Sequence, residues 1–427
     1  MAALEEIKPG SVVEGLVPER EALQGKVFDV LGRLFTEVAL RDLMLEAIRY
    51  NSTDEGRAKM RAKIDSAWTK ETLDGVQATG LTAIVRTGEQ GWLCGTGALL
   101  LRSTSAELCP QYLALRLSAP QSVRWLKSHA VGAVMPNLNE SILRQFPVEF
   151  PPLLEQRATA GVLGALDDKI ELNRRTNETL EEIARALFKS WFVDFDPVRA
   201  KSEGRQPWGM DAGTAALFPS EFDDSELGKI PNGWQVGRLD DIADVTMGQS
   251  PLGDTYNEAR DGLPFYQGTR DFGWRFPAHR VWCNAPTRLA EAGDSLLSVR
   301  APVGELNVAR ERCAVGRGVA AVRPRTGFRG FLHYALQLSQ SGWDKFEAEG
   351  TVFGSASKAD VTGFPVVVSD ARTELAFGRL VEPVDARILN DTAESETLAE
   401  LRDTLLPKLM SGAVRVRDAE RAVEVVG

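Results

Sequence analysis

Long apolar runs are absent from this chain of 427 residues. No stretch approaches the roughly 18 consecutive apolar residues that a membrane-spanning helix needs, and the opening MAALEEIKPG lacks the basic and apolar regions of a signal peptide. The composition, with 43% hydrophobic and 26% charged residues, is typical of a folded globular protein. We therefore expect a cytoplasmic protein that has no membrane partner and is long enough for two or more domains.

Cysteine and histidine are scarce as well. The four cysteines, Cys94, Cys109, Cys283 and Cys313, show no C-x-x-C spacing, and the three histidines do not group with them. Zinc sites and disulfide frameworks both require such grouping. We expect free thiols in the core and no metal bound by this chain.

Two catalytic motifs are also missing. The sequence has no (N/D)PPY tetrapeptide, with which adenine methyltransferases hold a flipped base, and no G-x-x-x-x-G-K-(S/T) loop, with which ATPases cradle phosphates. The acidic pairs Asp167–Asp168 and Asp194–Asp196 have no companion motif, so solvated acids near helix ends explain them better than a metal site. Any chemistry linked to this chain is expected to come from a partner.

Charge is distributed unevenly along the chain. The net charge of −10, taken as an average, argues against a nucleic-acid partner. Residues 255–330 depart from that average, because they hold twelve arginines, no lysine and seven acidic residues, a local balance of +5. Arginine without lysine favours bidentate contacts with guanine edges and phosphates. Ordinary structural ion pairs, for example between Asp271 and its arginine neighbours, are the alternative.

Two segments have apolar residues at alternating steps of three and four, the a/d spacing of a coiled-coil seam. The second segment repeats the first at an offset of 218 residues, with polar interruptions at the same two places. We predict an antiparallel coiled coil between them, the alternative being two ordinary amphipathic core helices. Arg402 in the second seam is a mismatch, and Pro383 and Pro407 are expected to limit or kink that helix. The predicted seam residues are Leu163, Leu166, Ile170, Leu180, Leu187 and Trp191 in the first segment and Val384, Ile388, Leu398, Leu405 and Leu409 in the second.

The repeat extends upstream of both seams. Residues 124–148 align with residues 342–366 at the same offset, which pairs Trp125 with Trp343 and Phe146 with Phe364. Further upstream the offset becomes 221, where GTGALLLR aligns with GRGVAAVR. Each half is therefore predicted to be a strand-rich module that ends in a long helix.

Several segments carry a family resemblance. IPNGWQVGRLDDIADVTMGQSPLGDTYN from residue 230, FKSWFVDFDPVRAK from 188, GMDAGTAALFPSEFDDSELG from 209 and LLPKLMSGAVRV from 405 resemble the specificity subunit of type I restriction–modification systems. The resemblance implies an α+β fold, in which two strand-rich target-recognition domains are separated by two long helices that form an antiparallel coiled coil. It also implies double-stranded DNA, two modification (methyltransferase) subunits and restriction (translocase–nuclease) subunits as partners. S-adenosylmethionine, ATP and Mg²⁺ would be bound by those partners, and no cofactor by this chain.

The resemblance begins near residue 80. Residues 1–79 form an atypical N-terminal segment, interpreted either as a divergent part of the first recognition domain or, with slight preference, as a replacement of that part. The expected organisation continues with the rest of that domain (80–151), a central helical spacer (152–200), a linker (201–228), a second recognition domain (229–369) and a C-terminal helical spacer with its tail (370–427). The competing function is a coiled-coil adaptor or regulator that has partly lost DNA recognition.

The resemblance and the local charge together give a hypothesis for the DNA contacts. A helix from Leu163 to Trp191 is about 42 Å long at 1.5 Å per residue, slightly more than the 34 to 36 Å that B-DNA advances per turn. The coiled coil is therefore expected to act as a ruler between two short contacts, so that the target is split by an unread gap. The residues predicted to bind DNA are Arg260, Arg270, Arg275, Arg280, Arg300 and Arg317.

Overall fold

A computed structural model describes residues 82, 99–102, 105–131, 138–148, 150–326, 328–346 and 354–426. The chain divides into two compact units. In the described part of the chain, unit 1 contains the residues up to Asn177 and those from Asn390 onward, and unit 2 contains Glu178–Leu389. The atypical segment 1–79 lies outside the described residues, as do residues 80–81, 83–98 and 103–104 of the expected first recognition domain.

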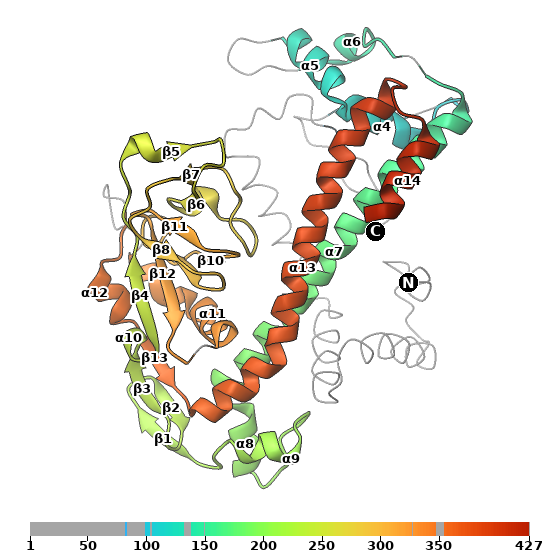
Figure 1. The fold of residues 1–427 in the computed structure, drawn as a ribbon. Coiled ribbons are helices and arrows are strands. Elements are labelled where there is room, and N and C mark those ends of the chain that lie inside the picture. The colour runs from blue at the N-terminus through green and yellow to red at the C-terminus, as the bar shows by residue number, and fades with distance from the viewer. Residues whose placement is uncertain are drawn as a thin grey trace. The chain divides into compact units, whose positions relative to one another are not determined.

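Two long helices contribute to both units. Helix α7 spans Leu153–Phe192 and helix α13 spans Ala371–Met410, each of 40 residues. At 1.5 Å per residue, each is about 60 Å long. Figure 1 draws α7 in green and α13 in red. The predicted pair of long helices is thus confirmed, and both helices are longer than their predicted seams. Helix α13 continues through Pro383 and Pro407, so neither proline ends it, and the kink expected as the other outcome stays a prediction.

In unit 1 the two helices run antiparallel. Asp167 of α7 accepts a hydrogen bond from Arg402 of α13 at 2.8 Å, and further along α7 Asn173 donates one to Glu394 at 2.7 Å, so residue numbers rise on one helix as they fall on the other. Arg402 is therefore accommodated by an ion pair at the edge of the seam. The apolar side of the pair is buried together with α14 (Val416–Val426). The other described helices of this unit are α4 (Pro110–Ser118), α5 (Pro120–His129) and α6 (Glu140–Leu143).

The predicted seam residues are buried in both units. Ten of the eleven are 8% exposed or less, and Ile170 is half-buried. The polar interruptions are buried too, and Asn173 and Asn177 bond across to α13, with Asn177 donating to Thr392 at 3.3 Å. A polar pair inside an apolar seam favours one register, because any shift would leave buried amides without partners.

Unit 2 contains the strand-rich module. An antiparallel sheet has the order β10–β9–β12–β4, and a mixed sheet has the order β5–β7–β6–β11–β8, in which only β6 and β11 are parallel neighbours. Two further pairs are β1–β2 and β3–β13. The strand bounds are β1 Phe222–Ser225, β2 Gly228–Pro231, β3 Gln235–Arg238, β4 Ala243–Met247, β5 Tyr256–Asn257, β6 Leu263–Tyr266, β7 Trp282–Cys283, β8 Leu289–Ala290, β9 Ser295–Ser298, β10 Leu306–Val308, β11 Cys313–Val315, β12 Val319–Pro324 and β13 Pro365–Val368.

Short helices cover this module and connect it to the long helices. Strand β12 is buried on both faces, since Ala320 and Val322 pack against Leu332 of α11 while Val319 and Ala321 pack against the mixed sheet. This alternation follows from the period of two in a strand. The helices of unit 2 besides the two long ones are α8 Asp196–Ser202, α9 Ala212–Ala216, α10 Leu239–Ile242, α11 Arg329–Leu338 and α12 Lys358–Thr362, with 3₁₀ turns η2 Gly253–Thr255, η3 Thr269–Asp271 and η4 Gln340–Phe346.

One contact recurs in the two halves of the sequence repeat. Trp125 meets Phe146 edge-on, with ring centroids 5.1 Å apart, and the aligned residues Trp343 and Phe364 stack at 4.2 Å. The aligned aromatic pairs therefore come together in both halves, although the ring geometry differs. The contact supports the repeat as a structural one.

Candidate nucleic-acid interface

Five strand ends of unit 2 meet at one place, which we call the strand-end junction. It consists of residues 248–250 after β4, 267–270 after β6, 299–300 after β9 and 316–318 between β11 and β12. Backbone hydrogen bonds tie these segments together: Gly248 donates to Val319 at 2.9 Å, Val299 donates to Gly318 at 2.9 Å, and Gly316 donates to Tyr266 at 2.9 Å. Segments that are far apart in the sequence thus lie next to one another in one region of the module.

Glycine makes this close approach of backbones feasible. A Cβ atom at Gly248 would lie 2.2 Å from the carbonyl oxygen of Gly316, and one at Gly318 would lie 2.4 Å from that of Gln267. Both distances are too short for any side chain. The three loops can pack this tightly only because these two positions are glycine.

Three of the six predicted arginines lie at the junction. Arg270, Arg300 and Arg317 are exposed. None of them has an acidic side chain within 4 Å among the residues that the structure describes. Their guanidinium groups are therefore available to an anion or a base edge. The junction also carries a polar pair, in which Gln267 donates to Ser250 at 3.2 Å.

The other predicted arginines have different surroundings. Arg280 donates to the buried carboxylate of Asp271 at 2.7 Å. A structural ion pair with Asp271, the alternative to DNA contact, therefore forms with Arg280. Arg260 has its guanidinium carbon 5.7 Å from the centre of the Trp282 ring and adopts a positive φ of 62°. The structure brings neither residue into the junction segments. Both stay predictions as DNA contacts.

Arg275 requires a correction. Its side chain is only 5% exposed and donates to Glu181 and Asp385, each at 2.7 Å. A side chain enclosed in this way has no surface for a base or a phosphate. The structure therefore argues against DNA contact by Arg275 and gives it a structural role.

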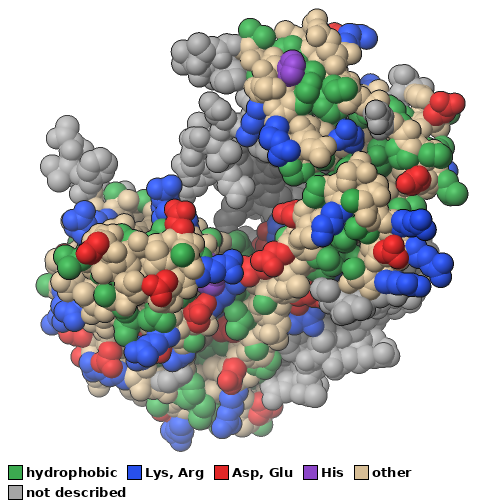
Figure 2. Space-filling model, turned by 45° about the horizontal axis from the view of Figure 1, so that its top comes forward, with side chains coloured by type: hydrophobic (Ala, Val, Ile, Leu, Met, Phe, Trp, Pro, Cys, Tyr) green, Lys and Arg blue, Asp and Glu red, His purple; other side chains and the backbone are tan. Residues whose placement is uncertain are grey.

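Several other arginines of residues 255–330 also have acidic partners. The pairs are Arg323 with Asp294 at 2.7 Å, Arg325 with Asp244 at 2.9 Å and Arg312 with Glu291 at 3.4 Å. Much of the local positive charge is thus neutralised within the module. On the face drawn in Figure 2, basic and acidic side chains are accordingly interspersed. What the junction offers is three arginines on neighbouring segments, without acidic partners in the described part of the chain, rather than a large basic patch.

The sequence patterns did not predict the uncharged polar residues of the junction. Gln249, Ser250 and Gln267 are not charged and so did not contribute to the charge count. A usable signal was present, since Gln249 and Gln267 each lie beside a glycine at the end of an apolar stretch, in MGQS and FYQG, and Ser250 directly follows Gln249. Glycines at strand ends favour loops whose polar neighbours face outward.

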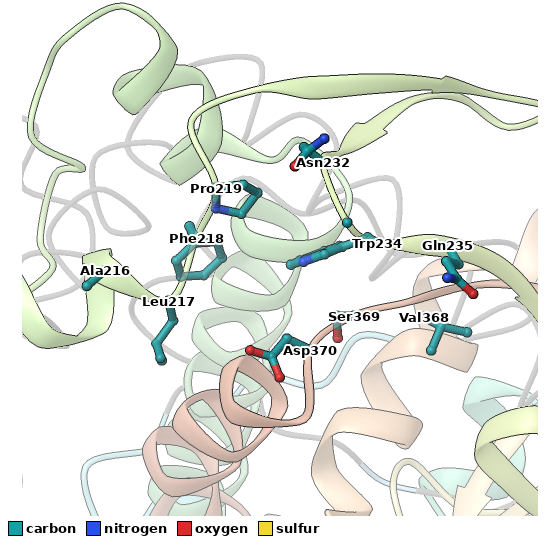
Figure 3. Close-up of a pocket in the computed structure, with 11 residues that line it drawn as sticks. Ala216, Leu217, Phe218, Pro219, Asn232, Trp234, Gln235, Val368, Ser369 and Asp370 are labelled. Atoms are coloured by element: carbon teal, nitrogen blue, oxygen red, sulfur yellow. The ribbon is translucent and has the colours of Figure 1, made fainter.

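A separate pocket lies beside the start of α13. It has a volume of about 620 Å³ and is lined by residues of the segments 216–219, 232–235 and 368–370. Figure 3 shows Phe218 and Trp234 on its walls and the Asp370 carboxylate near its rim. Its lining includes no histidine, cysteine or lysine, and its one hydroxyl, that of Ser369, donates to Glu374 at 3.0 Å.

The described residues were expected to hold no metal, and their cysteines were expected to be free. No group of three or more histidine, cysteine or acidic side chains there is placed to hold a metal ion. No helix in the same part of the chain has both the length and the apolar character that crossing a membrane demands. Cys109, Cys283 and Cys313 are free and buried, as expected for core thiols.

Comparison with known proteins shows which family the chain resembles. Residues 73–182 match the model of the type I restriction modification DNA specificity domain. The putative MjaX specificity subunit of Methanocaldococcus jannaschii is 27% identical over 79% of this chain and 76% of its own length. The chain is thus similar to type I restriction enzyme specificity subunits over most of its length.

The chain is also similar to other specificity subunits. The HindI specificity subunit of Haemophilus influenzae is 23% identical over 76% of this chain and 81% of its own. Among solved structures, the HsdS subunit of Thermoanaerobacter tengcongensis is 27% identical, with coverage of 72% of this chain and 71% of that one and a TM-score of 0.35. Specificity subunits are non-catalytic members of their complexes. The similarity to curated specificity subunits favours the predicted DNA-reading function over the adaptor alternative.

Proposed function

We propose that this chain is the DNA-reading subunit of a type I restriction–modification complex and that the strand-end junction is its reading surface in the second recognition domain. The observation that carries this is the convergence of Arg270, Arg300 and Arg317, exposed and without acidic partners among the described residues, in a chain similar to type I specificity subunits. Exposed guanidinium groups can bind guanine edges bidentately as well as phosphates.

The chemistry would then belong to the partners. In this proposal two modification subunits dock on the chain and methylate adenine within a two-part site, and restriction subunits cleave DNA that lacks the mark. S-adenosylmethionine, ATP and Mg²⁺ would be bound by those subunits. Because the complex acts on chromosomal and incoming DNA, the cytoplasm is its compartment.

A gel-shift titration tests DNA reading. The chain is incubated with a pool of duplex DNA, alone and with its modification subunits, at a fixed salt concentration, because salt changes such affinities strongly. We expect sequence-specific binding that is strongest in the assembled complex. Equal affinity for all sequences in both samples would contradict the proposal.

The helix pair is proposed to set the length of the unread gap. Seven residues inserted after Asn177, together with seven inserted after Ile388, preserve the heptad phase on both helices and keep the antiparallel partners opposite each other. The insertion adds about 10 Å, or about three base pairs of B-DNA. We expect a gap longer by that amount and unchanged half-sites, measured by methylome sequencing.

The matched control carries the insertion after Asn177 alone. It shifts one helix against the other and separates Asn173 from Glu394, its partner at 2.7 Å. We expect a lower melting temperature for this control. An unchanged gap in the doubly lengthened protein would overturn the ruler.

A further inference from the structure

A buried ionic cluster joins the recognition module of unit 2 to both long helices. Nη1 of Arg275 donates to both carboxylate oxygens of Glu181, at 2.8 and 2.7 Å, and Nη2 donates to Asp385 at 2.7 Å. Glu181 belongs to α7 and Asp385 to α13, whereas Arg275 lies between η3 and β7 in the module. One guanidinium group therefore holds three segments that are distant in the sequence.

Helix α11 completes the cluster. Tyr334 donates to Asp385 at 3.0 Å, and its ring lies under the guanidinium group, 5.2 Å from the Arg275 Cζ atom to the ring centre. Gln337 donates to Glu181 at 2.9 Å. Because α11 also packs on β12 through Leu332, the cluster is connected directly to the sheet that carries the strand-end junction.

Such a cluster contributes more to geometry than to stability. Taking charges out of water costs several kcal/mol per ion, so a buried ion pair is often no more stabilising than apolar side chains of similar volume. A guanidinium group is a rigid planar fork, and its hydrogen bonds form only when both acceptors lie close to its plane. Few positions of the module on α7 and α13 satisfy both carboxylates at once.

The packing around the cluster is less specific. Phe188, Phe331 and Phe377 contact one another, with ring centroids 5.3 to 6.3 Å apart. Apolar contacts of this kind hold surfaces together but tolerate small rotations better than paired charges do. The cluster is therefore the part of this contact that specifies one orientation.

We propose that Arg275, Glu181 and Asp385 form an orientation clamp, which fixes the direction in which the recognition module presents the strand-end junction and thereby restricts the DNA gap that the protein accepts. This inference rests on the proposed function. Arg275 acts in it as a positioning residue, because it contacts no DNA. Its effect reaches the target through the angle of the module on the two helices.

The principal test is Arg275→Lys, which keeps the positive charge and removes the fork. We expect the preferred bases in the second half-site to be unchanged, while affinity for sites with a gap one base pair longer or shorter rises by about tenfold relative to the wild-type gap, equivalent to about 1.4 kcal/mol. Binding selection with the assembled complex on DNA libraries of varied gap length measures this. The matched control is Arg325→Lys, because Arg325 pairs with Asp244 at 2.9 Å while both side chains are more than half exposed.

A second variant separates orientation from stability. Arg275→Met combined with Glu181→Gln and Asp385→Asn removes every charge of the clamp, so no unpaired ion stays buried, and the two amide oxygens still accept from Gln337 and Tyr334. We expect a melting temperature close to that of the wild type together with the same relaxed gap preference.

The outcomes are distinguishable. A single wild-type gap in both variants overturns the clamp, and so does loss of base preference in the half-site, because Arg275 would then read bases. If Arg275→Lys and the uncharged triple variant both fail to fold, the cluster is required for folding rather than for orientation, and the inference is overturned as well. If the wild type itself shows no sequence preference, the proposed function fails, independently of the clamp.

Discussion

Arg270 and Arg317 are the residues at which DNA reading can be tested one side chain at a time. Each is exposed and has no acidic partner among the described residues, so replacing it by alanine removes a potential DNA contact without leaving a carboxylate unpaired. We expect Arg270→Ala and Arg317→Ala each to cost about 1 to 3 kcal/mol of binding and to relax one half-site, if they contact bases. If they contact only phosphate, affinity should fall uniformly and the salt slope should drop by about one.

Arg325→Ala is the matched control, since Arg325 is also exposed but pairs with Asp244. We expect its binding and its sequence preference to match the wild type. Unchanged preferences in both Arg270→Ala and Arg317→Ala would remove the junction from the reading surface. Binding selections on the four proteins decide.

Glu181 provides a prediction about pH. Burial by itself would raise its pKa, but His333, Arg275 and Gln337 around the carboxylate bring the pKa down to about 2 from an ordinary value of 4.5. Because this pKa is lower in the folded protein, the unfolded chain takes up the proton first as the pH falls. The ionised Glu181 therefore contributes to the free energy of unfolding above about pH 4.5, and this contribution is lost as the pH falls towards 2. The contribution is on the order of 3 kcal/mol.

Glu181→Gln removes this titration. Denaturant unfolding between about pH 5 and pH 2 should therefore show a shallower fall of the free energy of unfolding in the variant than in the wild type. The variant should also be less stable near neutral pH, because Arg275 loses a charged partner. Parallel pH profiles for the two proteins would show that the Glu181 carboxylate is not stabilised as the structure indicates.

The sequence predicted some of the arginines at the junction but not the surroundings of each one. Counting charge located the arginine-rich stretch, and three of its members meet at the junction. The count could not separate them from Arg275, because the two acids that enclose Arg275 lie 94 and 110 residues away in the chain. Partners that far apart become neighbours only through the tertiary fold.

Among the elements, α7 offers a direct comparison of a buried and an exposed leucine. Leu166 is 1% exposed and packs with Leu398 and Leu405 of α13, whereas Leu172 on the same helix is 42% exposed. We expect Leu166→Ala to cost about 2 to 5 kcal/mol, since it leaves a cavity in the seam. Leu172→Ala should change stability by no more than about 0.5 kcal/mol. Similar melting temperatures for the two variants would contradict the helix pairing in unit 1.

The elements differ in how far the sequence predicted them. The helix pair was predictable because the a/d spacing is local and repeats over many turns, as Leu163, Leu166 and Ile170 illustrate. The strands were expected only as a strand-rich module. They are two to six residues long, and the parallel pairing of Ala314 with Phe265 joins residues with no common local pattern. Short strands carry too few residues for a period of two to stand out.

At the scale of the whole molecule, the sequence repeat relates the two halves of the chain. The same offset that relates the two seams also relates the Trp125–Phe146 contact to the Trp343–Phe364 contact. The match to the specificity-domain model covers residues 73–182, so it includes only the last residues of the atypical segment 1–79. The two interpretations of residues 1–79 predict different targets: a divergent domain predicts two sharp half-sites, and a replacement predicts one sharp and one poorly defined half-site.

The central claim is that this chain makes a type I complex read a two-part DNA site. The most direct measurement is methylome sequencing of a host strain that carries this chain together with its modification subunits, compared with the same strain in which this chain is deleted. The account predicts adenine methylation at one motif made of two short segments with a constant unread gap, and its complete loss in the deletion strain. Methylation at an uninterrupted motif, or the same motif in both strains, would contradict it.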